Sequence, residues 1–165
     1  MQVDHFLAYF ENSHRLTVKT CRLLPPERWA FRPTEEIFTS GELIGHIAYS
    51  QRAMTEGAVK ADFRWIPEEA TQSIDSLPKG LAFLDECHAH AIGLYKTLTD
   101  VQFQDTIATP FGFEATRSQL AGGMLDHENH HRGQLHTYLR LMGVEGKVLG
   151  SLFHDLCFLQ LRAKA

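Results

Sequence analysis

Residues 116–142 read TRSQLAGGMLDHENHHRGQLHTYLRLM, and this stretch carries the longest helical pattern of the chain. At about 100° per residue, five of its apolar side chains fall within about 60° of one direction: Leu120, Met124, Leu135, Tyr138 and Met142. His127 and His131 lie within about 20° of the centre of this stripe, one helical turn apart. Gly143 follows the last turn, where glycine commonly ends a helix. The stretch therefore predicts an amphipathic helix with two histidines on its buried side.

Three further segments have apolar residues at the same helical spacing. The first ends before Pro25-Pro26, because proline disfavours a helix at the residue that precedes it. Ser40 is the expected N-cap of the second segment. The expected helices are Val3–Leu24, Ser40–Lys60, Leu77–Thr99 and Thr116–Met142.

The rest of the chain is less regular. Residues 100–116 are expected to be irregular, with an extended turn near residues 109–113, and the tail from Lys147 could add a short helix over Leu149–Leu161. There is no internal repeat and no alternation long enough to build a sheet. We therefore predict an all-α fold, an antiparallel four-helix bundle with a short C-terminal helix, formed by residues 1–165 as a single domain.

The composition argues against several classes of function. Sixteen lysines and arginines against twenty aspartates and glutamates give a net charge of −4, which disfavours binding to nucleic acid or to anionic membranes. No stretch approaches the ~20 apolar residues of a membrane span, and the N-terminus lacks the pattern of a secretory signal. Cys21, Cys87 and Cys157 are widely spaced, which favours a reducing cytoplasm over a disulfide framework. We expect a cytoplasmic protein with a small-molecule substrate.

His46 is a third candidate metal ligand, on the second helix. It lies about 60° from the apolar stripe and faces the small side chains of Ser50, Ala53 and Gly57, which leave room for a pocket. Together with His127 and His131 it would leave coordination positions free for water or substrate, as catalytic metal sites do. Nitrogen ligands favour zinc, nickel or iron(II) over magnesium or calcium. The alternative is that each histidine is a hydrogen-bonded residue of the core.

Other histidines and cysteines fit the bundle interior without a metal. His14 and His88 also point inward, and we interpret them as core hydrogen-bonding residues or as the lining of a pocket, rather than as ligands. Cys21 and Cys87 lie on inward stripes, where a free cysteine commonly acts as a small apolar residue.

The letters from His127 to His131 match HExxH, the signature of zinc metalloproteases. Such proteases use a sheet edge and a later third ligand, and Gln134 and Thr137 stand where the longer form of the motif needs glycine and histidine. A protease is therefore disfavoured. Glu128 remains a candidate catalytic residue, as a base or as a group that supports the ligands.

Two motifs resemble a known family. The string DHENHHRGQLHTYLR at residues 126–140 and ELIGHIA at residues 42–48, with Phe31-Arg32-Pro33 before them, are similar to the DinB/YfiT-like superfamily over roughly residues 3–143. The resemblance implies a four-helix bundle whose second and fourth helices bind a divalent ion through positions that match His46, His127 and His131. Residues 147–165 lack the proline that relatives often have in their tails, so the resemblance does not extend to them.

The resemblance also implies a range of activities. Relatives include metal-dependent thiol transferases that use bacillithiol, mycothiol or glutathione, and a thiol-dependent isomerase. Many relatives are homodimers, and some are known only as stress- or damage-induced proteins.

Three hypotheses follow from the sequence. The first is a metal-dependent transferase or hydrolase for a small electrophilic or xenobiotic molecule, with a low-molecular-weight thiol as co-substrate. The second is a stress-response protein that binds a metal or a small ligand without catalysis, and the third is a structural helical dimer. Trp65, Phe111 and Phe113 lie in loops that could line a pocket, close the end of the bundle or form a dimer contact.

Overall fold

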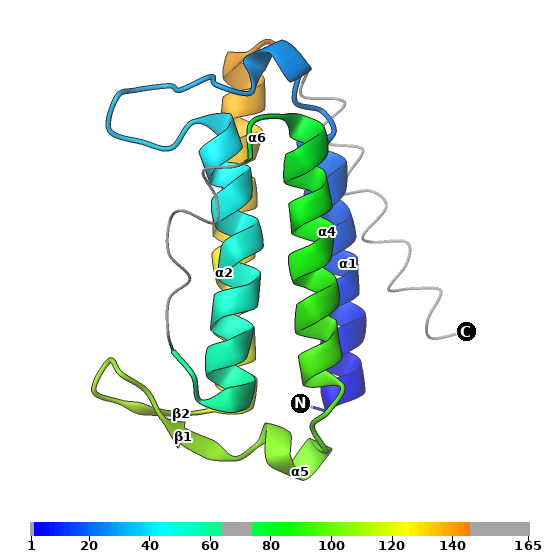
Figure 1. The fold of residues 1–165 in the computed structure, drawn as a ribbon, viewed down its shortest axis with the longest axis vertical. Coiled ribbons are helices and arrows are strands. Elements are labelled where there is room, and N and C mark those ends of the chain that lie inside the picture. Colours follow the sequence, from blue (N-terminus) through cyan, green and yellow to red (C-terminus); the bar gives the residue numbers. More distant parts are fainter. Residues whose placement is uncertain (1, 64–73, 146–165) are drawn as a thin grey trace.

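A computed structural model describes residues 2–63 and 74–145 of the chain. Four long helices stand side by side and form a bundle, which confirms the predicted all-α four-helix fold (Figure 1). These helices are α1 (Val3–Cys21), α2 (Ser40–Lys60), α4 (Leu77–Tyr95) and α6 (Arg117–Leu141). Among the described helices, none combines the length and the hydropathy that crossing a membrane requires.

Two helices run in each direction. One core cluster joins the beginnings of α2 and α4 to the ends of α1 and α6, and a second cluster joins the opposite ends. Neighbouring α2 and α4 are therefore parallel, as are α1 and α6, whereas α2 and α6 are antiparallel (Figure 1). Helical periodicity predicts the helices but not these directions. The connection of residues 61–76 is long enough to lead from the end of α2 to either end of α4, because about 16 extended residues reach ~50 Å, whereas α2 is ~31 Å long.

Several helix ends differ from the prediction. Helix α1 ends at Cys21 rather than Leu24, because the chain continues in turns with a hydrogen bond from the Leu24 amide to the Cys21 carbonyl. The N-cap of α2 is Thr39, not Ser40. Its hydroxyl accepts a hydrogen bond from the Glu42 amide, and the Glu42 carboxylate accepts one from the Thr39 amide.

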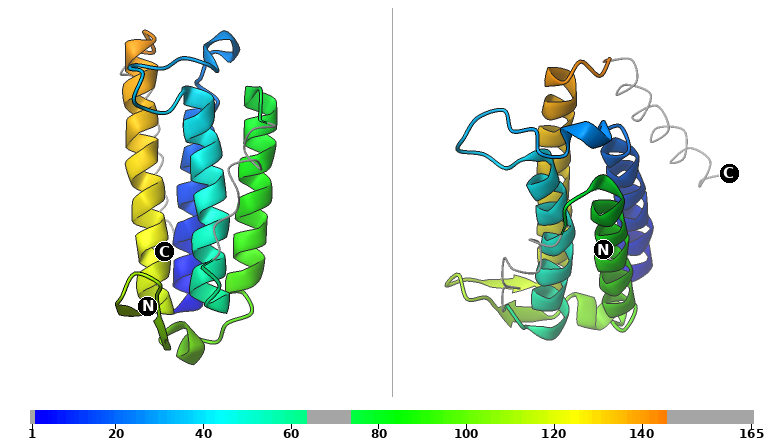
Figure 2. Two further views of the ribbon diagram at one scale, coloured as in Figure 1. Left: turned by 60° about the vertical axis from the view of Figure 1, so that its left-hand side comes forward. Right: turned by 45° about the horizontal axis from the view of Figure 1, so that its top comes forward.

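The segment expected to be irregular contains short regular elements. Helix α4 ends at Tyr95, and Thr99 caps the separate short helix α5 (Asp100–Phe103). Strands β1 (Thr106–Ala108) and β2 (Glu114–Thr116) form an antiparallel hairpin, at the opposite end of the bundle from the connection between α1 and α2 (Figure 2). The expected helix over residues 149–161 and Trp65 lie outside the described residues.

The α1–α2 connection begins with the 3-10 helix η1 (Pro26–Arg28) and inserts Trp29 between α2 and α4. A Cβ atom on Gly80 would lie 2.5 Å from the Trp29 ring, and one on Gly41 would clash with the same ring. These glycines allow the indole to join the core cluster at this end of the bundle. At the end of α6, Gly143 has φ 88°, and its amide and that of Val144 donate to the carbonyls of Arg140 and Leu139, as expected for the predicted stop.

Candidate metal centre

Helices α2 and α6 bring three of the predicted residues together. His46 lies in the second turn of α2, whose start is fixed by the Thr39–Glu42 capping box. His127 and His131 lie one turn apart on α6, which packs against α2 through the core cluster that contains Leu43 and Leu135. The antiparallel contact between the two helices therefore positions all three imidazoles.

The three Nε2 atoms form a small triangle. The Nε2 atom of His46 lies 3.2 Å from that of His127 and 3.2 Å from that of His131, and the third side measures 3.1 Å. Zinc–nitrogen bonds of about 2.0–2.1 Å at tetrahedral angles place two ligand nitrogens about 3.3 Å apart. The observed triangle fits a divalent transition metal held by three nitrogens. Within residues 2–63 and 74–145, no other group of three or more histidine, cysteine or carboxylate side chains has this geometry.

Burial keeps these imidazoles neutral. Burial, and then the charge of a protonated His131, lower the pKa of His46 to about 4. Burial, followed by the charges of His131, His46 and His130, lowers the pKa of His127 to about 4, and burial also lowers the pKa of His131. Since only neutral imidazole can coordinate a metal, the protein holds the triad in its binding form at neutral pH.

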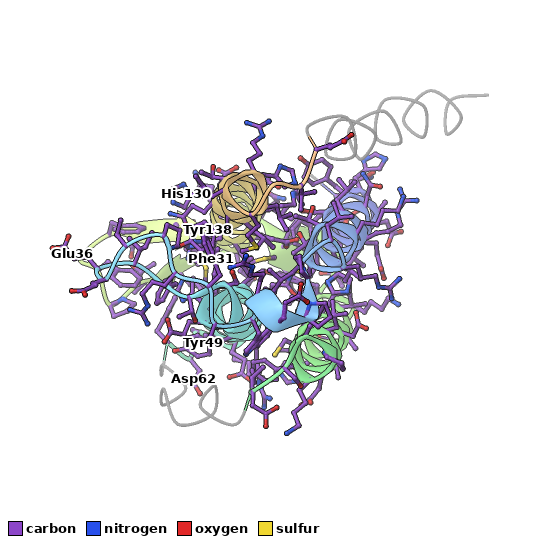
Figure 3. All side chains as sticks on the ribbon, turned by 90° about the horizontal axis from the view of Figure 1, so that it is seen from above. Phe31, Glu36, Tyr49, Asp62, His130 and Tyr138 are labelled. Atoms are coloured by element: carbon purple, nitrogen blue, oxygen red, sulfur yellow. The ribbon has the colours of Figure 1, made fainter. Side chains whose placement is uncertain are left out.

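One face of the site is formed by the connection between α1 and α2. The Phe38 ring stacks on the His46 ring at a centroid distance of 5.0 Å, and the Tyr138 hydroxyl donates to the Phe38 carbonyl at 2.9 Å. Seen along the bundle, Tyr138 and Phe31 lie between α6 and α2, and Glu36 marks the outer tip of the connection (Figure 3). Phe38 is 42% exposed, so its ring forms an apolar ledge beside His46. Sequence reasoning missed this ledge, because a loop has no periodicity that shows which way its side chains point.

Glu128 lies apart from the triad, inside the bundle. Its Oε1 atom accepts hydrogen bonds from the hydroxyls of Ser13 at 3.2 Å and Thr17 at 2.5 Å, and its Oε2 atom accepts one from the Gln51 amide at 2.8 Å. The Arg132 guanidinium lies 3.8 Å away. The side chain is 1% exposed, and its hydrogen bonds connect α6 to α1 and α2. Its catalytic role stays a prediction.

The strip of small residues expected to leave room near His46 is filled at its Gly57 end. Ser50 and Ala53 are buried, and a Cβ atom on Gly57 would lie 2.7 Å from ring carbons of Phe63. The expectation of space along this strip is therefore wrong at its Gly57 end. Phe111 and Phe113 are exposed at the tip of the hairpin, about three helical turns along α6 from His127.

His14 and His88 form a separate cluster between α1 and α4. Their rings stack at 3.7 Å and 5°, and each Nε2 atom meets a carboxylate, Asp85 at 2.9 Å and Glu11 at 3.3 Å. A surface cavity of about 800 Å³ beside α1 is lined by Glu11, His14 and Asp85 and by none of the three triad histidines. These two histidines are thus hydrogen-bonded residues near a cavity, as expected.

The two described cysteines are buried thiols. Burial is the largest cause that raises the pKa of each to about 12, so neither is a thiolate at neutral pH. They provide apolar packing, as expected for Cys21 and Cys87.

Comparison with known proteins places this fold among relatives. The model of the DinB superfamily matches residues 9–135. YjoA of Bacillus subtilis (strain 168), an uncharacterized protein, is 26% identical over 147 residues, which cover 86% of this chain and 88% of YjoA. YfiT from Bacillus subtilis, described as a probable metal-dependent hydrolase with an unusual four-helix bundle topology, superposes with a TM-score of 0.69 at 19% identity over 87% of this chain and 89% of YfiT. A mycothiol-dependent maleylpyruvate isomerase has a TM-score of 0.64 at 13% identity, over 82% of this chain and 61% of the isomerase.

Proposed function

The chain belongs to the DinB superfamily, and from this membership and its three converging histidines we propose that it is a metal-dependent enzyme for a small electrophilic molecule. The reaction class is a thiol S-transfer or a hydrolysis. The single observation that carries the proposal is the triangle of Nε2 atoms with sides of 3.1–3.2 Å. Three protein ligands leave at least one coordination position for a reactant, as in catalytic metal sites.

In this proposal His46, His127 and His131 bind zinc, nickel or iron(II). When bound, such an ion lowers the pKa of a thiol or a water molecule and so supplies a nucleophile at neutral pH. The apolar ledge of Phe38 would hold the apolar part of the substrate and keep water away from one side of the site. The YfiT description supports hydrolysis, and the mycothiol-dependent isomerase supports a low-molecular-weight thiol as co-substrate. The cytoplasmic location and the homodimer stay predictions.

The test combines metal analysis with turnover. Purified protein, loaded in turn with zinc, nickel and iron(II), is assayed with glutathione or cysteine and an aryl or alkyl electrophile, and with an activated ester. We expect turnover in at least one combination, with the activity and one metal equivalent lost together in H131A. Turnover that survives in metal-free H131A would overturn the proposal.

A second candidate function is the binding of a metal or a small ligand without catalysis. The hydrogen bonds on both oxygens of Glu128 favour it, because they occupy the carboxylate that the sequence offered as a base. Stoichiometric metal binding with no turnover in any combination would support this candidate.

A further inference from the structure

Gln134 contacts the rings of two histidines on its own helix. Its Oε1 atom lies 2.7 Å from Nδ1 of His131, and its Nε2 atom lies 3.2 Å from Nε2 of His130. Gln134 follows His131 by three residues and His130 by four, and both spacings place side chains next to each other on a helix. One amide therefore connects an exposed histidine to a buried member of the triad.

The first of these contacts determines which nitrogen of His131 carries the proton. A neutral imidazole has one N–H group, and a nitrogen that binds a metal must present its lone pair. If the proton of His131 is on Nδ1, its Nε2 atom is free to coordinate. The Gln134 carbonyl oxygen accepts a hydrogen bond but cannot donate one, so its position at 2.7 Å selects this tautomer.

The second contact determines which way the amide faces. The Gln134 NH₂ group can donate to the Nε2 atom of His130 only while its oxygen faces His131. If the amide turned over, its NH₂ group would face Nδ1 of His131 and would favour the tautomer with a proton on Nε2. That tautomer cannot coordinate through Nε2.

We propose that Gln134 is a positioning residue of the metal centre, which holds His131 in its metal-binding tautomer, and that His130 keeps the Gln134 amide in the required orientation. Partners that orient a metal-binding histidine in this way commonly change metal affinity 10–100-fold when they are removed. The inference rests on the proposed three-histidine site, but it does not depend on which reaction the site performs.

The experiment measures zinc affinity by competition with a chromophoric chelator. Q134L keeps a helix-forming side chain of similar size but removes the acceptor, and we expect it to weaken zinc binding about 10–100-fold. Q134E keeps an oxygen acceptor for His131, and we expect it to bind zinc at least as tightly as the wild type. H130A frees the amide to turn over, and we expect a measurable loss that is smaller than that of Q134L. Zinc affinity equal to that of the wild type would overturn the role of His130. Equal zinc affinity in Q134L and wild type would overturn the proposal.

A spectroscopic readout separates positioning from a general structural effect. In the metal-free protein, long-range ¹H–¹⁵N correlation spectra should place the His131 proton on Nδ1 in wild type and Q134E. In Q134L the spectra should show a mixture of the two neutral tautomers, with the proton on Nδ1 in one and on Nε2 in the other. A wild-type spectrum with the proton on Nε2 would overturn the inference even if Q134L does not fold. R140A, an exposed change further along α6, is the control and should leave zinc affinity unchanged.

The two proposals fail in different ways. If H131A retains the full zinc affinity of the wild type, the three-histidine site itself is wrong. If H131A loses zinc and Q134L does not, only the role of Gln134 is wrong.

Discussion

His127 and Glu128 are adjacent on α6, yet their side chains have different partners. The Nε2 atom of His127 lies 3.2 Å from that of His46, whereas the Oε1 atom of Glu128 lies 2.5 Å from the Thr17 hydroxyl of α1. One residue therefore belongs to the candidate metal centre and the next to the contact between helices. A change at Glu128 should consequently alter stability more than metal binding.

We expect Glu128→Gln to lower the free energy of unfolding by about 2–3 kcal/mol. The new NH₂ group must face either the Gln51 amide or the hydroxyls of Ser13 and Thr17, and Arg132 loses its carboxylate partner. Urea unfolding of the zinc-loaded protein measures the loss, and chelator competition should show nearly unchanged zinc affinity. Full stability together with lost turnover would instead assign Glu128 to catalysis.

We expect His46→Ala to remove the bound metal, because two ligands on one helix cannot replace the third nitrogen from α2. The metal content, measured by mass spectrometry, should fall from about one equivalent per chain in wild type to near zero in H46A. His90→Ala is the matched control, since His90 contacts Glu56 and lies outside the triad. A chelator should lower the melting temperature of wild type and of H90A but not of H46A. Equal metal content in H46A and wild type would contradict the site.

We expect acid to destabilise the fold through His88. Burial, and then the charge of a protonated His14, lower its pKa from 6.5 to about 4, against the opposing influence of Glu11 and Asp85. The unfolded chain therefore binds more protons between pH 6.5 and 4, and the free energy of unfolding falls as the pH drops through that range.

The measurement is urea unfolding of the metal-free protein at pH 7 and pH 5. His88→Gln does not titrate and can still donate to Glu11, so wild type should lose about 2 kcal/mol more than H88Q between the two pH values. Groups that do not interact with His88 contribute equally in both proteins and cancel in the difference. If the two proteins lose the same stability, His88 does not carry this dependence.

The predicted triad illustrates what helical periodicity can reveal. His127 and His131 are four residues apart on an apolar stripe, so their common direction follows from helix geometry alone. Placing His46 beside them required the further assumption that the second and fourth helices are neighbours. The fold confirms this assumption, because α2 and α6 share one core cluster. Gln134 was one of several polar residues near the motif, and only the coordinates single out its contact with His131.

Other features depend on which helix lies beside which. Periodicity places Glu128 next to the stripe, but the hydroxyls that bind it come from α1, and no pattern within α6 predicts that neighbour. Phe38 reaches His46 because hydrogen bonds from the Tyr138 hydroxyl and within the Thr39–Glu42 capping box hold the connection in place. Such contacts between distant segments cannot be deduced from local sequence.

We expect Gly80→Ala and Gly93→Ala to change stability in opposite directions, although both exchange glycine for alanine on α4. A Cβ atom on Gly80 would lie 2.5 Å from the Trp29 ring, so the indole must shift and the free energy of unfolding should fall by about 1–3 kcal/mol. Among the described residues, no heavy atom beyond the surrounding helix backbone lies within 4 Å of the corresponding position on Gly93. Alanine there should add about 0.5–1 kcal/mol through helix propensity. Denaturant unfolding followed by circular dichroism measures both changes. A stabilised G80A would mean that Trp29 does not lie against α4 as described.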